Sequence, residues 1–150
     1  MQCFPRTLIL RHRKENLKKC SLRGLESRGD IKFLVYPGGT LPDLSAYVLL
    51  TLNAPVLTEA DADKGLFLLD GTWRYAEVMH RWVSGQVPVI ERSLPVDLCT
   101  AYPRRQDDDR GLASIEALYA AYRLTNRDPA GLLDDYYWKE PFLAKNPSLR

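Results

Sequence analysis

A short apolar run that ends in a carboxylate is the part of this chain best placed to do chemistry. Residues 66–69 are all apolar, and Asp70, Gly71, Thr72 and Trp73 follow at once. In an open α/β sheet, small ligands bind beyond the carboxyl ends of the strands, where this loop is expected to lie. Gly71 permits a tight turn, and Thr72 is a good N-cap for a helix. A ligand loop is one interpretation, and an ordinary strand–turn–helix corner is the other.

The indole of Trp73 adds a chemical preference to this loop. Its ring can pack against a methyl or alkyl group, and its π-face attracts a cation such as a sulfonium. A helix that starts here leaves backbone amides without intrahelical partners. Asp70 adds a carboxylate at the end of the strand, which either faces a ligand or caps the helix and braces the loop.

The surrounding pattern is that of an α/β protein. Continuous apolar runs recur, as expected of strands buried on both faces of a parallel sheet. They are residues 7–10, 32–36, 47–52, 66–69 and 88–90. Helical spacing appears at 72–83 and 112–124, and we expect one short helix at 131–137 in the tail. We therefore expect a single α/β domain over residues 1–150, with a mostly parallel sheet flanked by helices.

Composition narrows the function classes. A hydrophobic content of 45%, a charged content of 27% and a net charge of +2 fit a soluble globular protein and exclude a histone-like polycation. The apolar runs are too short to cross a bilayer, and the start does not read as a signal peptide. Cys3, Cys20 and Cys99 form no close pair, which favours the reducing cytoplasm. His12 and Glu15 lack further ligands nearby, so we expect no metal.

Positive charge is concentrated in residues 11–23, which hold six Lys or Arg residues. Such a run is either a solvated face or a patch that contacts the phosphates of a nucleic acid. Arg11, Arg13 and Lys14 are the first cations in it. Arg104 and Arg105 follow Pro103 in a second basic loop, where they are either solvated or bound to phosphates.

Four segments in order resemble the DTW-domain proteins. The signature Asp-x-Thr-Trp-x-x-Ala is present as Asp70, Thr72, Trp73 and Ala76. The other segments are residues 8–15, residues 20–24, and a late loop and helix at residues 102–105 and 111–117. That family includes transfer-RNA uridine aminocarboxypropyltransferases, and it is related to enzymes that modify a pseudouridine of small-subunit ribosomal RNA. The chain departs from the family in lacking a cysteine-rich zinc-type start. Its turn at residues 20–22 also lacks the usual Asn-Thr pair.

The resemblance implies transfer of a 3-amino-3-carboxypropyl group from S-adenosylmethionine to N3 of a uridine or pseudouridine in tRNA or rRNA. It also implies a fold similar to the SPOUT methyltransferases, with a knot in the C-terminal half. The implied catalytic residues are Asp70 and then Glu116. The implied cofactor-binding residues are Asp70, Thr72, Trp73, Ala76 and Ser114. The implied RNA-binding residues are Arg11, Arg13, Lys14, Arg104 and Arg105.

Other interpretations stay open at this point. Glu116 can be a helix-face carboxylate and Ser114 a packing residue. The chain can also be a SPOUT-like RNA methyltransferase, a non-catalytic RNA-binding or ribosome-assembly factor, or an interaction domain unrelated to RNA. The position of a transferred label separates the first from an aminocarboxypropyltransferase. The intact Asp-x-Thr-Trp-x-x-Ala motif favours an enzyme over the non-catalytic interpretations.

Overall fold

The computed structural model describes residues 5–14, 21–71, 73–102 and 112–150. The strands in these residues are β1 (Thr7–His12), β2 (Ile31–Tyr36), β3 (Tyr47–Leu50), β4 (Gly65–Asp70) and β5 (Ile90–Arg92). The helices are α1 (Trp73–Gln86), α2 (Ser114–Leu124) and α3 (Lys139–Lys145). Short 3₁₀ turns lie at Leu25–Ser27, Glu59–Asp61 and Pro147–Leu149.

Within the described residues the strands form one parallel five-stranded sheet in the order β2-β1-β4-β3-β5. The predicted α/β class is thus confirmed. Every residue of the interior strand β1 is buried, including Arg11 and His12, which follow the predicted apolar run at 7–10. The edge strand β2 is partly exposed, so the expectation of burial on both faces is wrong there. The last strand is Ile90–Arg92 rather than 88–90, because Pro88 cannot donate a ladder hydrogen bond.

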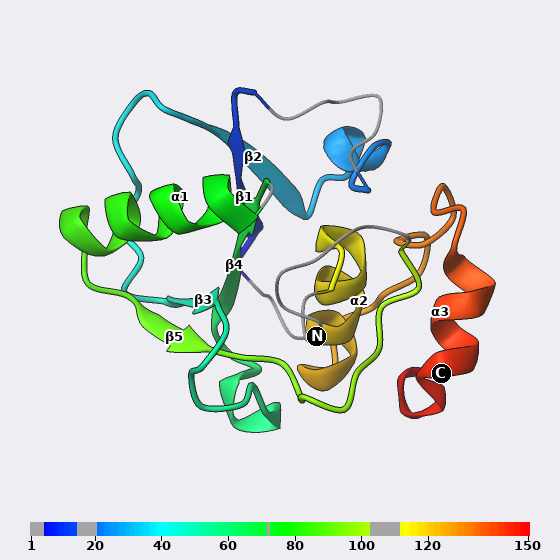
Figure 1. The fold of residues 1–150 in the computed structure, drawn as a ribbon. Coiled ribbons are helices and arrows are strands. Elements are labelled where there is room, and N and C mark those ends of the chain that lie inside the picture. The colour runs from blue at the N-terminus through cyan, green and yellow to red at the C-terminus, as the bar shows by residue number, and fades with distance from the viewer. Residues whose placement is uncertain (1–4, 15–20, 72, 103–111) are drawn as a thin grey trace.

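The two faces of the sheet carry separate apolar clusters, one under α1 and one under α2 (Figure 1). Because side chains alternate along a strand, Leu8 and Leu10 join the α1 cluster while Ile9 joins the α2 cluster. The same alternation in β4 sends Phe67 toward α1 and Leu68 toward α2. Figure 1 shows α3 outside α2, so α2 is packed between the sheet and the C-terminal tail.

Both predicted helices of the body of the chain are confirmed. In α1, Met79 and Val83 are fully buried, as their spacing predicts. In α2, the predicted apolar face holds Ile115 and Leu118, which are also buried. The helix buries more than that face, however, because Glu116 is 0% exposed as well. A charged side chain in such a place requires partners, and these are described below.

The tail differs from the prediction. The helix expected at 131–137 is wrong, since this stretch forms successive turns and the helix begins at Lys139. Gly131 has a φ of +84°, which interrupts a helix. Pro141 lies in the first turn of α3, where its missing N–H costs nothing. Phe142 is fully buried, so the tail docks on the core, whereas Tyr137 is 84% exposed.

Tyr122 joins α2 to the amino ends of β1 and β2. Its hydroxyl bonds to Thr7 Oγ1 at 2.9 Å and donates to Asp30 Oδ2 at 3.0 Å. Burial, reinforced by the charge of Asp30, raises the pKa of Tyr122 to about 12. Because the unfolded chain ionises first, this tyrosine lowers the unfolding free energy as the pH rises from about 10 toward 12.

Tyr122→Phe is expected to lower the unfolding free energy at neutral pH by about 1 kcal/mol, because the buried hydroxyl of Thr7 and the more exposed carboxylate of Asp30 each lose a partner. It should also remove about 1 kcal/mol of the further decline that is expected at about pH 11. Urea unfolding at both pH values measures the two effects. Tyr137→Phe, which changes a tyrosine that is 84% exposed, is the control. An unchanged alkaline decline in Tyr122→Phe would contradict the assignment.

Candidate active site

Arg11 and Asp70 meet at the carboxyl ends of the two central strands. The parallel register pairs Arg11 with Asp70 directly, and their side chains point to the α2 face. Arg11 Nε donates to Asp70 Oδ2 at 3.0 Å, with the two side chains 10% and 3% exposed. The guanidinium also lies 4.4 Å from the centroid of the Phe33 ring. Asp70 is therefore held in a buried ion pair at the edge where a ligand is expected.

The start of α2 closes this pair from the other side. Ser114 Oγ donates to Asp70 Oδ1 at 3.0 Å, so both oxygens of this carboxylate accept a hydrogen bond. The amide of Ile115 donates to Ser21 Oγ at 3.1 Å. The hydroxyl oxygen of Ser21 therefore caps the start of α2.

Glu26 completes the chain of charges. Arg11 Nη1 donates to Glu26 Oε1 at 3.3 Å, and the amide of Gly24 donates to Oε2 at 2.9 Å. Burial opposes the charge of Glu26, but the backbone amides and Arg11 outweigh it, so the pKa of Glu26 lies below its usual value. Sequence reasoning missed Glu26, because the residues around it do not show that it lies beside Arg11, 15 residues earlier in the chain.

Glu116 is the hub of a second, separate set of bonds. Its Oε1 accepts from Thr100 Oγ1 at 2.6 Å and from the amide of Ala113 at 2.8 Å. Its Oε2 accepts from the amide of Ala101 at 2.8 Å and from the hydroxyl of Tyr136 at 3.0 Å. Glu116 thus joins the 99–102 loop, the start of α2 and the tail.

On the α1 face of the same edge, His12 packs into an aromatic group. Its ring stacks on Tyr75 with centroids 3.9 Å apart, and it contacts Tyr36 at 5.4 Å. The amide of Lys14 donates to Nδ1 at 3.1 Å. Burial, and then the charges of Lys14 and Arg13, lower the pKa of His12. A neutral imidazole therefore links α1 to the turn after β1.

The remaining predicted site residues differ in exposure, and some lie outside the described residues. Arg11, predicted as an RNA contact, is 8% exposed and paired with Asp70 and Glu26. Arg13 and Lys14 are exposed beside it, and Ala76 is half-buried on α1. The predictions for four further residues lie outside what the structure describes. These are Thr72, the side chain of Trp73, Arg104 and Arg105.

Gly71 fits tightly between β4 and α1. A Cβ at this position would lie 3.0 Å from Tyr75 Cβ and 3.3 Å from Met79 Cε. Gly71→Ala is therefore expected to lower the unfolding free energy by about 1–2 kcal/mol, which thermal unfolding would show. Gly85→Ala near the end of the same helix, where the added Cβ meets open space, should stabilise by about 0.5–1 kcal/mol. A Gly71→Ala variant as stable as the parent would contradict the tight packing.

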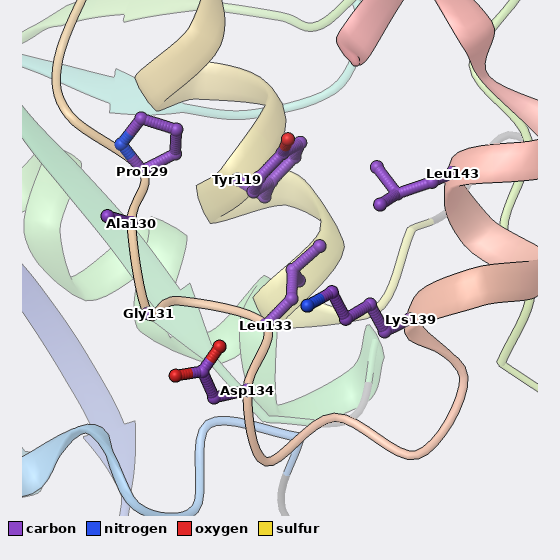
Figure 2. A pocket seen from close by; sticks show the side chains of 8 residues that line it. All are labelled: Tyr119, Pro129, Ala130, Gly131, Leu133, Asp134, Lys139 and Leu143. Atoms are coloured by element: carbon purple, nitrogen blue, oxygen red, sulfur yellow. The ribbon is translucent and has the colours of Figure 1, made fainter.

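Two shallow hollows lie away from this edge. One of about 190 Å³ lies between α2, the tail turn and α3 (Figure 2). It is lined by Tyr119, Pro129, Ala130, Gly131, Leu133, Asp134, Lys139 and Leu143. The other, of about 280 Å³, is lined by Glu77, His80 and Arg81. Neither contains a predicted site residue, so the carboxyl edge remains the candidate site.

Two further searches cover the described ranges. In the residues that the structure describes, no three His, Cys, Asp or Glu side chains gather closely enough to hold a metal ion. No helix in those same ranges is long and apolar enough to cross a membrane.

Comparison with known proteins adds a likeness to a solved structure. No protein-family model and no curated protein sequence matches this chain. Among solved structures, the chain is similar to the S-adenosylmethionine-dependent rRNA aminocarboxypropyl (acp) transferase Tsr3 from Vulcanisaeta distributa. The TM-score is 0.73 and the sequence identity 25%, over 97% of this chain and 80% of that one. The parallel sheet and its flanking helices are thus arranged as in Tsr3, whereas the DTW-domain assignment stays a prediction.

Proposed function

We propose that this protein, a single domain, transfers an aminocarboxypropyl group from S-adenosylmethionine to ribosomal RNA, at N3 of a uridine or pseudouridine. The observation that carries the proposal is the likeness to the rRNA acp-transferase Tsr3 over almost the whole chain. The Asp70-to-Ala76 motif supports it, because the motif lies at the carboxyl end of central strand β4, where α/β folds bind ligands. The C-terminal knot remains part of the proposal.

The carboxyl edge has groups that fit S-adenosylmethionine. This molecule carries hydroxyls, an ammonium and a carboxylate, and it supplies an electrophilic carbon next to its positive sulfur. Asp70 and Ser114 offer acceptors and a hydroxyl at this edge, and the first turn of α1 offers backbone amides. The exposed 37–40 loop follows β2 at the same edge, and a Cβ added at Gly39 would meet open space. These residues, with Thr72 and Trp73, are the proposed cofactor contacts.

The hydrogen bonds suggest different roles for the two carboxylates. Asp70 Oδ1 is held by the Ser114 hydroxyl, which can rotate, so we assign Oδ1 as the atom that takes the N3 proton of the target base. Asp70 Oδ2 stays with Arg11, which orients the carboxylate. Glu116 is 0% exposed and shared by four donors, so its proposed role is positioning rather than proton transfer.

The exposed cations after β1 are the proposed phosphate contacts. Replacing both Arg13 and Lys14 with glutamine should weaken RNA binding and reduce the salt slope of log K by about two, because each released counterion contributes about 0.9. Filter binding over a salt series measures the slope. The control replaces Lys32 and Lys64, which lie toward the opposite, amino-terminal edge of the sheet. Equal slopes in both double variants would remove Arg13 and Lys14 from the RNA interface.

A transfer assay with two labelled cofactors tests the reaction itself. One cofactor carries its label on the methyl group, and the other carries it on the carboxyl carbon of the methionine part. The acceptors are rRNA and tRNA from cells that lack the gene. Carboxyl label in rRNA is the expected result, and digestion then identifies the base. Methyl label alone would indicate an RNA methyltransferase. RNA binding without either label would favour a non-catalytic RNA-binding or assembly factor.

A further inference from the structure

Asn146, just after α3, makes a two-bond bracket with a loop far away in the sequence. The amide of Cys99 donates to Asn146 Oδ1 at 2.7 Å, and Asn146 Nδ2 donates back to the carbonyl of Cys99 at 2.8 Å. The same Nδ2 donates to the carbonyl of Phe142 at 2.8 Å, and the side chain is buried. Asn146 therefore fixes the backbone of Cys99 relative to α3.

The bracketed loop is also held by Glu116, together with a second residue of the tail. Thr100 Oγ1 and the amide of Ala101 donate to Glu116, next in sequence to the bracket at Cys99. Tyr136 donates to the same carboxylate from the tail. The loop is thus clamped between the tail on one side and α2 on the other.

Glu116 connects the 99–102 loop to the candidate site through hydrogen bonds. It accepts from the amide of Ala113, which immediately precedes Ser114, and Ser114 donates to Asp70. A continuous path of bonded groups therefore runs from Asn146 through Glu116 to Asp70 and Arg11. A path of this kind positions a group precisely, because buried hydrogen bonds are directional.

Docking of the tail does not require a buried amide. Phe142 and Leu149, on either side of Asn146, are 0% and 3% exposed and anchor the tail by apolar contact. A buried polar side chain adds a desolvation cost that only well-made bonds offset. What the amide adds is a defined geometry for the 99–102 loop.

We propose that Asn146 is a positioning residue of the candidate site: through Cys99, Thr100 and Glu116 it sets the start of α2, and so places Ser114 against Asp70. Its catalytic consequence rests on the proposed function. Asn146→Ala should loosen the start of α2 and lower kcat for transfer. The Michaelis constant for RNA should change little, because the proposed phosphate contacts lie elsewhere.

The test compares Asn146→Ala with Leu149→Ala and Ser148→Ala. Leu149→Ala weakens apolar docking of the same tail, and Ser148 is exposed. Each variant is assayed about 10 °C or more below its own Tm. We expect kcat to fall about tenfold or more in Asn146→Ala and less than about twofold in the other two. Amide hydrogen exchange should show lost protection at Ala101 and Ala113 in Asn146→Ala, with β4 unchanged.

Lost protection together with a reduced kcat supports the proposal. Full protection at Ala101 and Ala113 in Asn146→Ala overturns it, and so does an unchanged kcat. An equal loss of kcat in Leu149→Ala also overturns it, because tail docking alone would then explain the effect. If the parent protein transfers no label, the proposed function fails. The exchange data then still decide whether Asn146 sets the start of α2.

Discussion

Asp70→Asn is expected to lower the unfolding free energy by about 3 kcal/mol and kcat for transfer by about 10²–10³-fold. The amide can still bond to Ser114 and Arg11, but it carries no charge. Arg11, which is 8% exposed, then keeps only the half-exposed Glu26 as a charged partner among the bonds described above. The stability loss follows from a buried cation that has lost its main counter-charge. The loss of rate follows from the missing proton acceptor.

Urea unfolding and the transfer assay measure the two effects of Asp70→Asn separately. Arg11→Met should destabilise similarly, and the double variant should cost clearly less than the sum of the two single variants. Asp63→Asn is the control, since the Asp63 side chain is 80% exposed. A cycle with additive single effects would falsify the buried pair. If the Asp70→Asn, Arg11→Met double variant regains stability but not transfer activity, the loss of activity is not caused by the loss of stability.

Glu116→Gln is expected to destabilise the protein by about 3–4 kcal/mol and to abolish transfer. Each carboxylate oxygen accepts from one backbone amide, that of Ala113 on Oε1 and that of Ala101 on Oε2. The hydroxyls of Thr100 and Tyr136 can rotate to accept, but a backbone N–H cannot. Whichever way the glutamine amide is turned, its NH₂ group therefore opposes a backbone donor. The clash separates the 99–102 loop from the start of α2.

Chemical unfolding and amide exchange at Ala101 and Ala113 measure this loss. Glu140→Gln is the matched control, because its side chain is 77% exposed and makes a single long ion-pair contact with Arg150 at 3.8 Å. We expect the control to change the unfolding free energy by less than about 0.5 kcal/mol. A Glu116→Gln variant within about 1 kcal/mol of the parent would show that the carboxylate is not needed at the hub.

The resemblance singles out two carboxylates, and their positions suggest two different roles. Asp70 stands at the strand edge with Arg11 and Ser114, so it lies where a substrate is expected to bind. Glu116 lies behind that edge and holds the segments that bring Ser114 to it. A catalytic pair of acids is one reading of the sequence motifs. The geometry favours Asp70 as the acid at the site. It favours Glu116 as a buried acid that holds the start of α2 in place.

Local patterns were enough for most of the fold. Continuous apolar runs predicted the buried strands, because a strand covered on both faces has no polar side to show. Helical spacing predicted α1 and α2, where one apolar face must meet the sheet. The pattern was wrong at 131–137, because the tail's apolar residues are spaced for docking onto α2 rather than for a helix of their own. It also misjudged β2, whose edge position depends on strand order.

For the site, the sequence by itself determined that a carboxylate, a tight turn and a helix start follow a buried strand, because those residues are adjacent in the chain. Strand order and register decided that Arg11 pairs with Asp70 and is buried at the sheet edge. Tertiary packing alone decided that Ser21 bonds to Ile115, Ser114 to Asp70 and Asn146 to Cys99. Their partners lie 94, 44 and 47 residues away along the chain, and local patterns carry no information about such distant neighbours.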